Sequence, residues 1–161
     1  MLDLAWIIPL APFVAFLLIA LGAHRSRAAS QYLALAGIVV ALVLSLGVLG
    51  AMVRAPEIVH PTSVPWFEMG GEHAVLGVYI DPTDAVMLAM VSVLCTLIFI
   101  YTIGYMHAEP RYARFFAYIS LFASAMLGAM ICDSLLAFFV CWEIMGTCSY
   151  LLIGFFWERP S

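Results

Sequence analysis

The chain has 161 residues, of which 66% are hydrophobic and only 10% are charged, and its formal net charge is −4. Soluble domains carry about a quarter charged residues, so this composition excludes a water-soluble globular protein. The scattered carboxylates and the low number of basic residues also exclude a nucleic-acid-binding surface. The composition therefore predicts an all-α integral membrane protein.

Apolar stretches close in length to the ~20 residues of a helical membrane crossing recur along the chain. They predict about five transmembrane helices, at residues 4–21, 31–53, 85–105, 115–132 and 134–157. The first stretch contains Pro9 and Pro12 near its start. Proline is tolerated in the first turn of a helix, and in membrane helices whose freed carbonyls find partners.

The arginines orient these spans. The chain has six arginines and no lysine. Five of the arginines lie between the first and second spans, between the third and fourth spans, or after the fifth span: Arg25, Arg27, Arg111, Arg114 and Arg159. The positive-inside rule places those segments in the cytoplasm, so the amino terminus is predicted outside and the carboxyl terminus inside. The many alanines and arginines and the lack of lysine suggest a GC-rich bacterial genome, and therefore a multi-pass protein of a bacterial plasma membrane.

The long outer segment between the second and third spans carries a β pattern. Gly70 and Gly71 separate two β-prone runs, which predicts a short outer hairpin over residues 64–81; an irregular loop is the alternative. Asp81 and Asp84 flank Pro82 and fit the first turn of the third span as caps, with a cation-entry role as the alternative. The predicted divisions are residues 1–63, the hairpin 64–81, and the three helices of 82–161.

Glu143 is an isolated acidic residue within the fifth predicted span. Ten residues beyond Asp133, it should lie ~15 Å along the helix, close to the midplane of a ~30 Å hydrocarbon core. A charged side chain there costs about 2.5–3.5 kcal/mol, so its presence predicts a role in proton or ion handling. The alternative is a structural carboxyl that is hydrogen-bonded to a neighbouring helix.

Residues three, four and seven positions from Glu143 share its helical face. Thr147 and Tyr150 carry hydroxyls that are candidates to support a water chain beside the carboxyl, although each could instead bond to backbone carbonyls. Gly146 and Gly154 would permit close approach of another helix or of water. The same face also includes Leu136, Phe139 and Val140.

Other polar and small residues indicate packing. The four cysteines lack CxxC spacing and the four histidines lack metal-ligand spacing, so no metal site or disulfide framework is predicted. A stripe of small residues at intervals of four in the fourth span predicts close helix packing in lipid: Ser120, Ser124, Gly128 and Cys132.

Three sequence stretches resemble the L subunit (chain five) of proton-pumping respiratory complex I, an antiporter-like membrane subunit. They are IYTIGYMHAEPRYARFFAYISLF (100–122), ML (126–127) and DSLLAFFVCWEIMGTCSYLLIGFF (133–156). The resemblance begins at about Trp66, and the first sixty residues match only in hydropathy and topology. It implies the N-terminal part of a longer antiporter-like fold built from inverted repeats, of which this sequence would be a truncated piece.

The resemblance also implies function. Glu143 would belong to a proton-translocation unit and pair with a lysine on a later helix, which lies outside this sequence. The chain itself would carry no redox site or cofactor, while the assembled enzyme would use NADH and quinone. Its partners would be other membrane-arm subunits and the lipid bilayer.

Departures from the family pattern keep two other functions open. The stretch 144–147 differs from the usual residues after Trp-Glu and is similar to the large subunit of Mrp-type cation/proton antiporters, and Phe99 stands where a histidine is common. The leading hypothesis is a subunit of a proton-translocating NADH:quinone oxidoreductase. The alternatives are a subunit of a Mrp-type multisubunit sodium/proton antiporter, and an inactive truncated scaffold.

Overall fold

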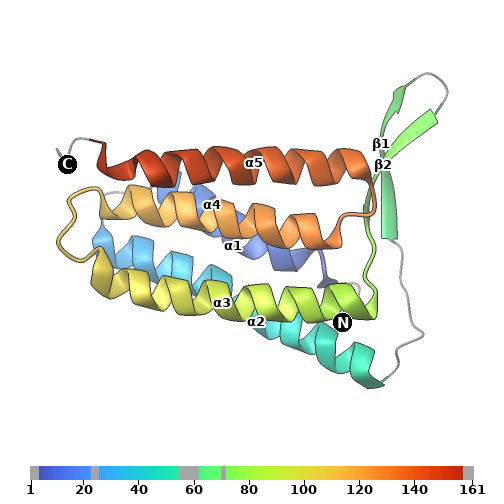
Figure 1. Ribbon diagram of the computed structural model, residues 1–161, viewed down its shortest axis with the longest axis horizontal. Coiled ribbons are helices and arrows are strands. Elements are labelled where there is room, and N and C mark those ends of the chain that lie inside the picture. Colours follow the sequence, from blue (N-terminus) through green and yellow to red (C-terminus); the bar gives the residue numbers. More distant parts are fainter. Residues whose placement is uncertain (1–3, 23–25, 55–61, 70–71, 158–161) are drawn as a thin grey trace.

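Five long helices and one hairpin make up the described part of the chain. The computed structural model describes residues 4–22, 26–54, 62–69 and 72–157. Figure 1 shows the helices side by side in one bundle, with the hairpin projecting from one end. The elements are α1 (Ile7–Leu21), α2 (Arg27–Arg54), β1 (Thr62–Met69), β2 (Glu72–Val78), α3 (Pro82–Tyr105), α4 (Tyr112–Ile131), α5 (Leu135–Ile153) and the 3₁₀ helix η3 (Gly154–Phe156). The predicted helical membrane fold is confirmed.

Four of the described helices are long and apolar enough to cross a membrane: α2, α3, α4 and the continuous segment Leu135–Phe156 formed by α5 and η3. The first helix is shorter than the predicted span 4–21, because α1 has only 15 residues. Its rise of about 22 Å is less than the ~30 Å thickness of a hydrocarbon core. It nevertheless runs within the bundle, against α2 and α4.

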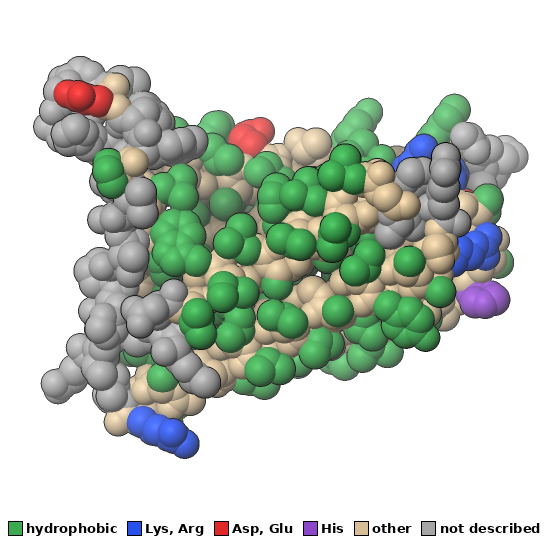
Figure 2. Space-filling view, turned by 180° about the vertical axis from the view of Figure 1, so that it is seen from behind, with side chains coloured by type: hydrophobic (Ala, Val, Ile, Leu, Met, Phe, Trp, Pro, Cys, Tyr) green, Lys and Arg blue, Asp and Glu red, His purple; other side chains and the backbone are tan. Residues whose placement is uncertain are grey.

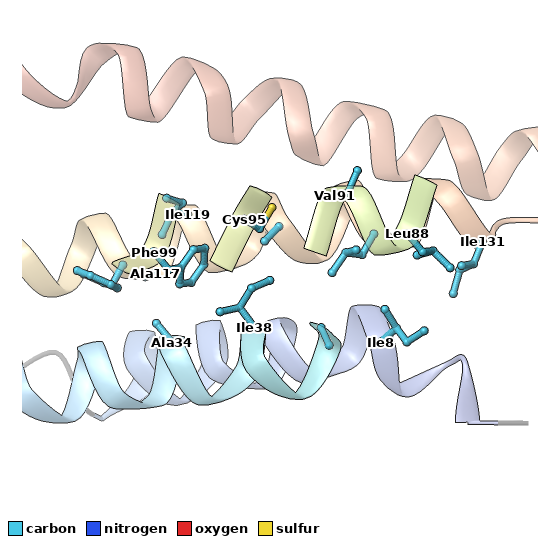
Figure 3. Close-up of a cluster of buried hydrophobic side chains, with 14 of the residues drawn as sticks. Ile8, Ala34, Ile38, Leu88, Val91, Cys95, Phe99, Ala117, Ile119 and Ile131 are labelled. Carbon is cyan, nitrogen blue, oxygen red and sulfur yellow. The ribbon is translucent and has the colours of Figure 1, made fainter. Parts of the chain in front are cut away.

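The apolar core lies between α1, α2, α3 and α4. Figure 3 shows side chains from these four helices meeting in one cluster. Phe99 of α3 and Phe116 of α4 pack edge to face within it, with ring centroids 6.3 Å apart. No described residue of α5 belongs to this cluster. Phe155 of η3, which directly follows α5, does belong to it. The fifth helix therefore covers the bundle from one side and is not enclosed by it.

The predicted small-residue stripe packs α4 against its neighbours. The hydroxyl of Ser124 donates a hydrogen bond to the carbonyl of Pro9 in α1 at 2.8 Å. A methyl group placed on Gly128 would lie 3.1 Å from Sγ of Cys141 in α5, so even the smallest side chain would make a tight contact there. Small residues at these positions let helices approach closely where the hydrophobic effect does not drive their association.

The hairpin is anchored to the bundle at its second strand. β1 and β2 pair antiparallel from Thr62–Val78 to Met69–Glu72, with an irregularity between Pro65 and Phe67. The predicted Gly70-Gly71 turn lies outside the described residues. The amide of Tyr79 donates to the carbonyl of Ile131 at 3.0 Å, and that of Asp133 donates to Gly77 at 3.3 Å.

The start of α3 is capped as predicted. Oδ1 of Asp81 accepts from the amide of Asp84 at 2.8 Å, and Oδ2 of Asp84 accepts from the amide of Asp81 at 3.1 Å. This reciprocal pair is a capping box, with Pro82 in the first turn. Both carboxylates therefore have a structural role at the helix end.

Basic residues gather at the end of the bundle opposite the hairpin. A guanidinium nitrogen of Arg27 donates to the carbonyl of His107 at 3.0 Å, which joins the α1–α2 connection to the α3–α4 loop. Figure 2 shows arginine and histidine side chains at this end, and arginine also at the other. Arg54 ends α2 on the hairpin side. Arg25 and Arg159 of the predicted cytoplasmic set lie outside the described residues.

We expect reporter fusions to place the arginine-rich end in the cytoplasm. Fusions after Arg27, after Arg111 and at Ser161 should report the cytoplasm, whereas a fusion after Glu72 should report the outer compartment, because positive loops are retained inside. Compartment-specific enzyme reporters would measure this. A cytoplasmic signal from the Glu72 fusion would contradict the assigned orientation.

Candidate functional site

Glu143 lies near the middle of α5. It is eight positions after Leu135, so it lies about 12 Å from the start of the helix. Its side chain is exposed on the outer surface of the described bundle. The described residues therefore do not enclose Glu143, and its proton-handling role stays a prediction. The physical reason is that α5 contacts α4 on one side only, and the described residues leave its other side uncovered.

The whole face predicted around Glu143 is exposed. Thr147 and Tyr150 lie on it, one and two turns beyond the carboxyl, so the structure keeps both hydroxyls on the carboxyl's side of α5. A methyl group placed on Gly146 or Gly154 would meet no atom within 4 Å. The close helix approach predicted at these glycines is therefore not made within the described residues.

The exposed face of α5 is strongly apolar apart from the acid. Only 11% of its apolar stretch is buried, compared with 33%, 44% and 56% in α2, α3 and α4. A hollow of about 720 Å³ runs along it beside Glu143. The lining residues are Leu135, Leu136, Phe138, Phe139, Trp142 and Glu143. The site therefore has one acidic group among apolar side chains.

Glu143 has no hydrogen-bond or ion-pair partner among the described residues. Basic residues of the described helices lie at helix ends: Arg27 and Arg54 at the two ends of α2, and Arg114 in the first turn of α4. No group of three metal-ligating side chains occurs within 4–22, 26–54, 62–69 and 72–157. A carboxyl group can accept or release a proton, and the described residues supply no cation beside Glu143 to pair with its charge.

Sequence reasoning missed a second acid, Glu109 in the α3–α4 loop. Its carboxylate is buried and lies 3.5 Å from Nε of Arg111. The same guanidinium stacks over the ring of Phe155 at 4.9 Å from the centroid. The sequence shows Glu109 two residues before Arg111, but it does not show that Phe155 lies beside them. Arg111 therefore links Glu109 in the loop to Phe155 in η3.

Cys132 and Cys141 meet where α4 passes to α5. The thiol of Cys132 donates to the carbonyl of Gly128 at 3.0 Å. Both thiols are partly buried beside Gly128, so they serve as small packing groups between α4 and α5.

Comparison with known proteins shows which family this sequence resembles. A family model described as NADH-Ubiquinone oxidoreductase (complex I), chain 5 N-terminus, matches residues 66–116. NAD(P)H-quinone oxidoreductase subunit 5 of the Mesostigma viride chloroplast is 38% identical over 98% of this chain and 25% of its own length. The chain is similar to the N-terminal part of complex I chain 5 proteins. Chain 5 of the Synechocystis sp. NAD(P)H-quinone oxidoreductase is 35% identical over 99% of this chain and 24% of its own length.

A further relative carries another electron donor in its name. F(420)H(2) dehydrogenase subunit L of Methanosarcina mazei is 38% identical over 99% of this chain and 23% of its own length. The chain thus spans about a quarter of the length of the curated relatives that it matches. The expectation that the first sixty residues share only hydropathy with the family is corrected, because these alignments include nearly the whole chain.

Proposed function

We propose that this chain is a membrane-arm subunit of a proton-translocating NADH:quinone oxidoreductase, in which Glu143 takes up and releases protons inside the bilayer. The observation that carries the proposal is the placement of Glu143 halfway along a membrane-spanning helix, on an apolar face. Ionisable groups at that depth are costly and are a mark of ion and proton pathways.

The geometry favours Glu143 over Glu109 as the proton carrier. Glu109 lies in a loop at the end of the bundle, where Arg111 holds its charge in an ion pair. Glu143 lies within a span, and Thr147 and Tyr150 present hydroxyls along the same helical face. Water held by those hydroxyls would connect the carboxyl toward the arginine-rich end of the bundle.

A proton relay needs a second station whose proton affinity changes relative to the first. The sequence contains no lysine, and the described spans place no arginine beside Glu143. We propose that a cationic group from another segment or subunit lies against the open face of α5. The family resemblance points to a lysine on a later helix for this role.

The assembled enzyme is proposed to use NADH and quinone at sites on other subunits, with no cofactor on this chain. The names of the Mesostigma viride and Synechocystis sp. relatives include both NAD(P)H and quinone, which supports this proposal. The name of the Methanosarcina mazei relative gives F(420)H(2) as the electron donor. The other membrane-arm subunits and the bilayer are the proposed partners. A bacterial plasma membrane is the proposed location, on the strength of the lysine-free, alanine-rich composition.

We expect the 161-residue chain alone to show no proton flux in liposomes above that of empty vesicles under a pH gradient. One station without its partner cannot pass a proton across the membrane. A tagged chain purified with its native partners should instead carry quinone reductase activity and pump protons during turnover. A pH-sensitive dye inside the vesicles would measure the proton flux of the isolated chain and the proton pumping of the purified assembly.

Three other outcomes would each contradict a part of the proposal. Flux through the isolated chain that depends on Glu143 would contradict the need for a second station. Co-purification with sodium/proton antiporter subunits, and without quinone reductase activity, would replace the proposal by the Mrp-type alternative. Assembly with normal pumping when Glu143 is replaced would leave only the scaffold role.

A further inference from the structure

A second hollow lies at the arginine-rich end of the bundle, away from Glu143. It occupies about 470 Å³ between the last turns of α1 and the first turns of α4. Its lining combines two arginines with apolar side chains: Phe16, Ile19, Ala20, Pro110, Arg111, Ala113, Arg114, Ala117 and Tyr118. Among the described residues, no acidic side chain lines it.

Two arginines, Arg111 and Arg114, form the rim of the hollow. Arg114 is exposed and has no hydrogen-bond or ion-pair partner among the described residues. Arg111 is held in place by Glu109 and by the ring of Phe155. Arginine guanidinium groups bind phosphate in a fixed fork geometry, so this rim suits a phosphate group.

The floor of the hollow is apolar and lies deeper in the membrane. Ala117 and Tyr118 follow Arg114 by about one helical turn, or ~5 Å, toward the centre of the bundle. Phe16 and Ile19 face them from α1. Figure 2 shows arginine side chains at this end of the molecule, bordering an apolar flank. A ligand that fits must therefore carry an anionic head and an apolar tail.

We propose that this hollow binds one anionic phospholipid. Its phosphate lies at Arg114 and Arg111, and an acyl chain lies over Phe16 and Ile19. Basic pockets between transmembrane helices at the cytoplasmic side suit such lipids. A zwitterionic headgroup would add a cation beside Arg114, and free phosphate would leave the apolar floor unfilled. The proposal does not depend on the role of Glu143.

Photo-crosslinking tests the site on the full chain in its native assembly. Photoactivatable phosphatidylglycerol should label peptides of the α1 end and the α4 start, as read by mass spectrometry, and photoactivatable phosphatidylcholine should label them weakly. Arg114→Gln should lower the phosphatidylglycerol labelling about fivefold, because one basic contact to the phosphate is lost. Ala20→Trp should lower it too, because the bulky ring fills the floor without changing charge.

Arg54→Gln is the matched control, since Arg54 is also an exposed arginine but lies at the opposite end of the bundle. It should leave the labelling unchanged, and excess inorganic phosphate should not compete. Equal labelling by both lipids, or an equal loss in Arg54→Gln, would overturn the proposal. Full competition by inorganic phosphate would show a phosphate site and would overturn it as well.

Discussion

Replacing Glu143 by glutamine should lower proton pumping by the assembled complex about tenfold or more, because glutamine keeps the shape but cannot carry a proton. The amount of complex in the membrane should stay unchanged. Glu143 makes no hydrogen bond or ion pair with the described residues, so the fold of the bundle does not depend on its charge. Removing a charge from an apolar span also removes an insertion cost.

Pumping would be measured as dye quenching in reconstituted vesicles, with subunit abundance measured in the same membranes. Glu68→Gln is the matched control, because Glu68 is an exposed glutamate on β1, outside the spans. It should pump normally. Normal pumping and normal abundance in Glu143→Gln would exclude the proton-carrying role, and loss of the complex itself would show a structural role.

Local signals in the sequence were sufficient for the elements of this fold. Long apolar stretches predict the bundle because a bilayer demands ~20 apolar residues per crossing, whatever the helices contact. The cap at Asp81 and Asp84 was predictable because a capping box involves only residues three apart. The hairpin followed from two β-prone runs that are neighbours in the chain.

The direction in which Glu143 points could not be predicted. Most residues of α5 are apolar on all sides, so the sequence carries no periodic pattern that marks an inner and an outer face. Which face is covered depends on contacts with α4, and these join distant residues such as Gly128 and Cys141. The burial of Glu109 was missed for the same reason, since Phe155 and Arg111 meet only in the folded chain.

The crossing of α1 and α2 was also invisible in the sequence. A methyl group placed on Gly37 would lie 3.0 Å from the carbonyl oxygen of Ala11, 3.0 Å from Cβ of Ala15 and 3.2 Å from Cα of Pro12. These atoms belong to the backbone or to the first side-chain carbon, so no flexible side-chain end can move aside. Nothing in the local sequence separates Gly37 from Gly50, where a methyl group would meet no atom within 4 Å.

Gly37→Leu should therefore destabilise the bundle, by about 1–3 kcal/mol if the helices shift only partly. The expected result is a lower yield of chain and complex in the membrane and a melting temperature, in mild detergent, reduced by several degrees. Gly37→Ala should show a smaller loss, because its single methyl group meets the same three atoms and no more.

Gly50→Leu is the control that isolates the crossing. It makes the same substitution on the same helix, at a position open to the surroundings, and leucine has a higher helix propensity than glycine. Its melting temperature should equal or exceed that of the original chain. If Gly37→Leu and Gly50→Leu melt alike, the close approach of α1 to α2 does not hold the bundle together, and α1 must be retained by its contacts with α4 instead.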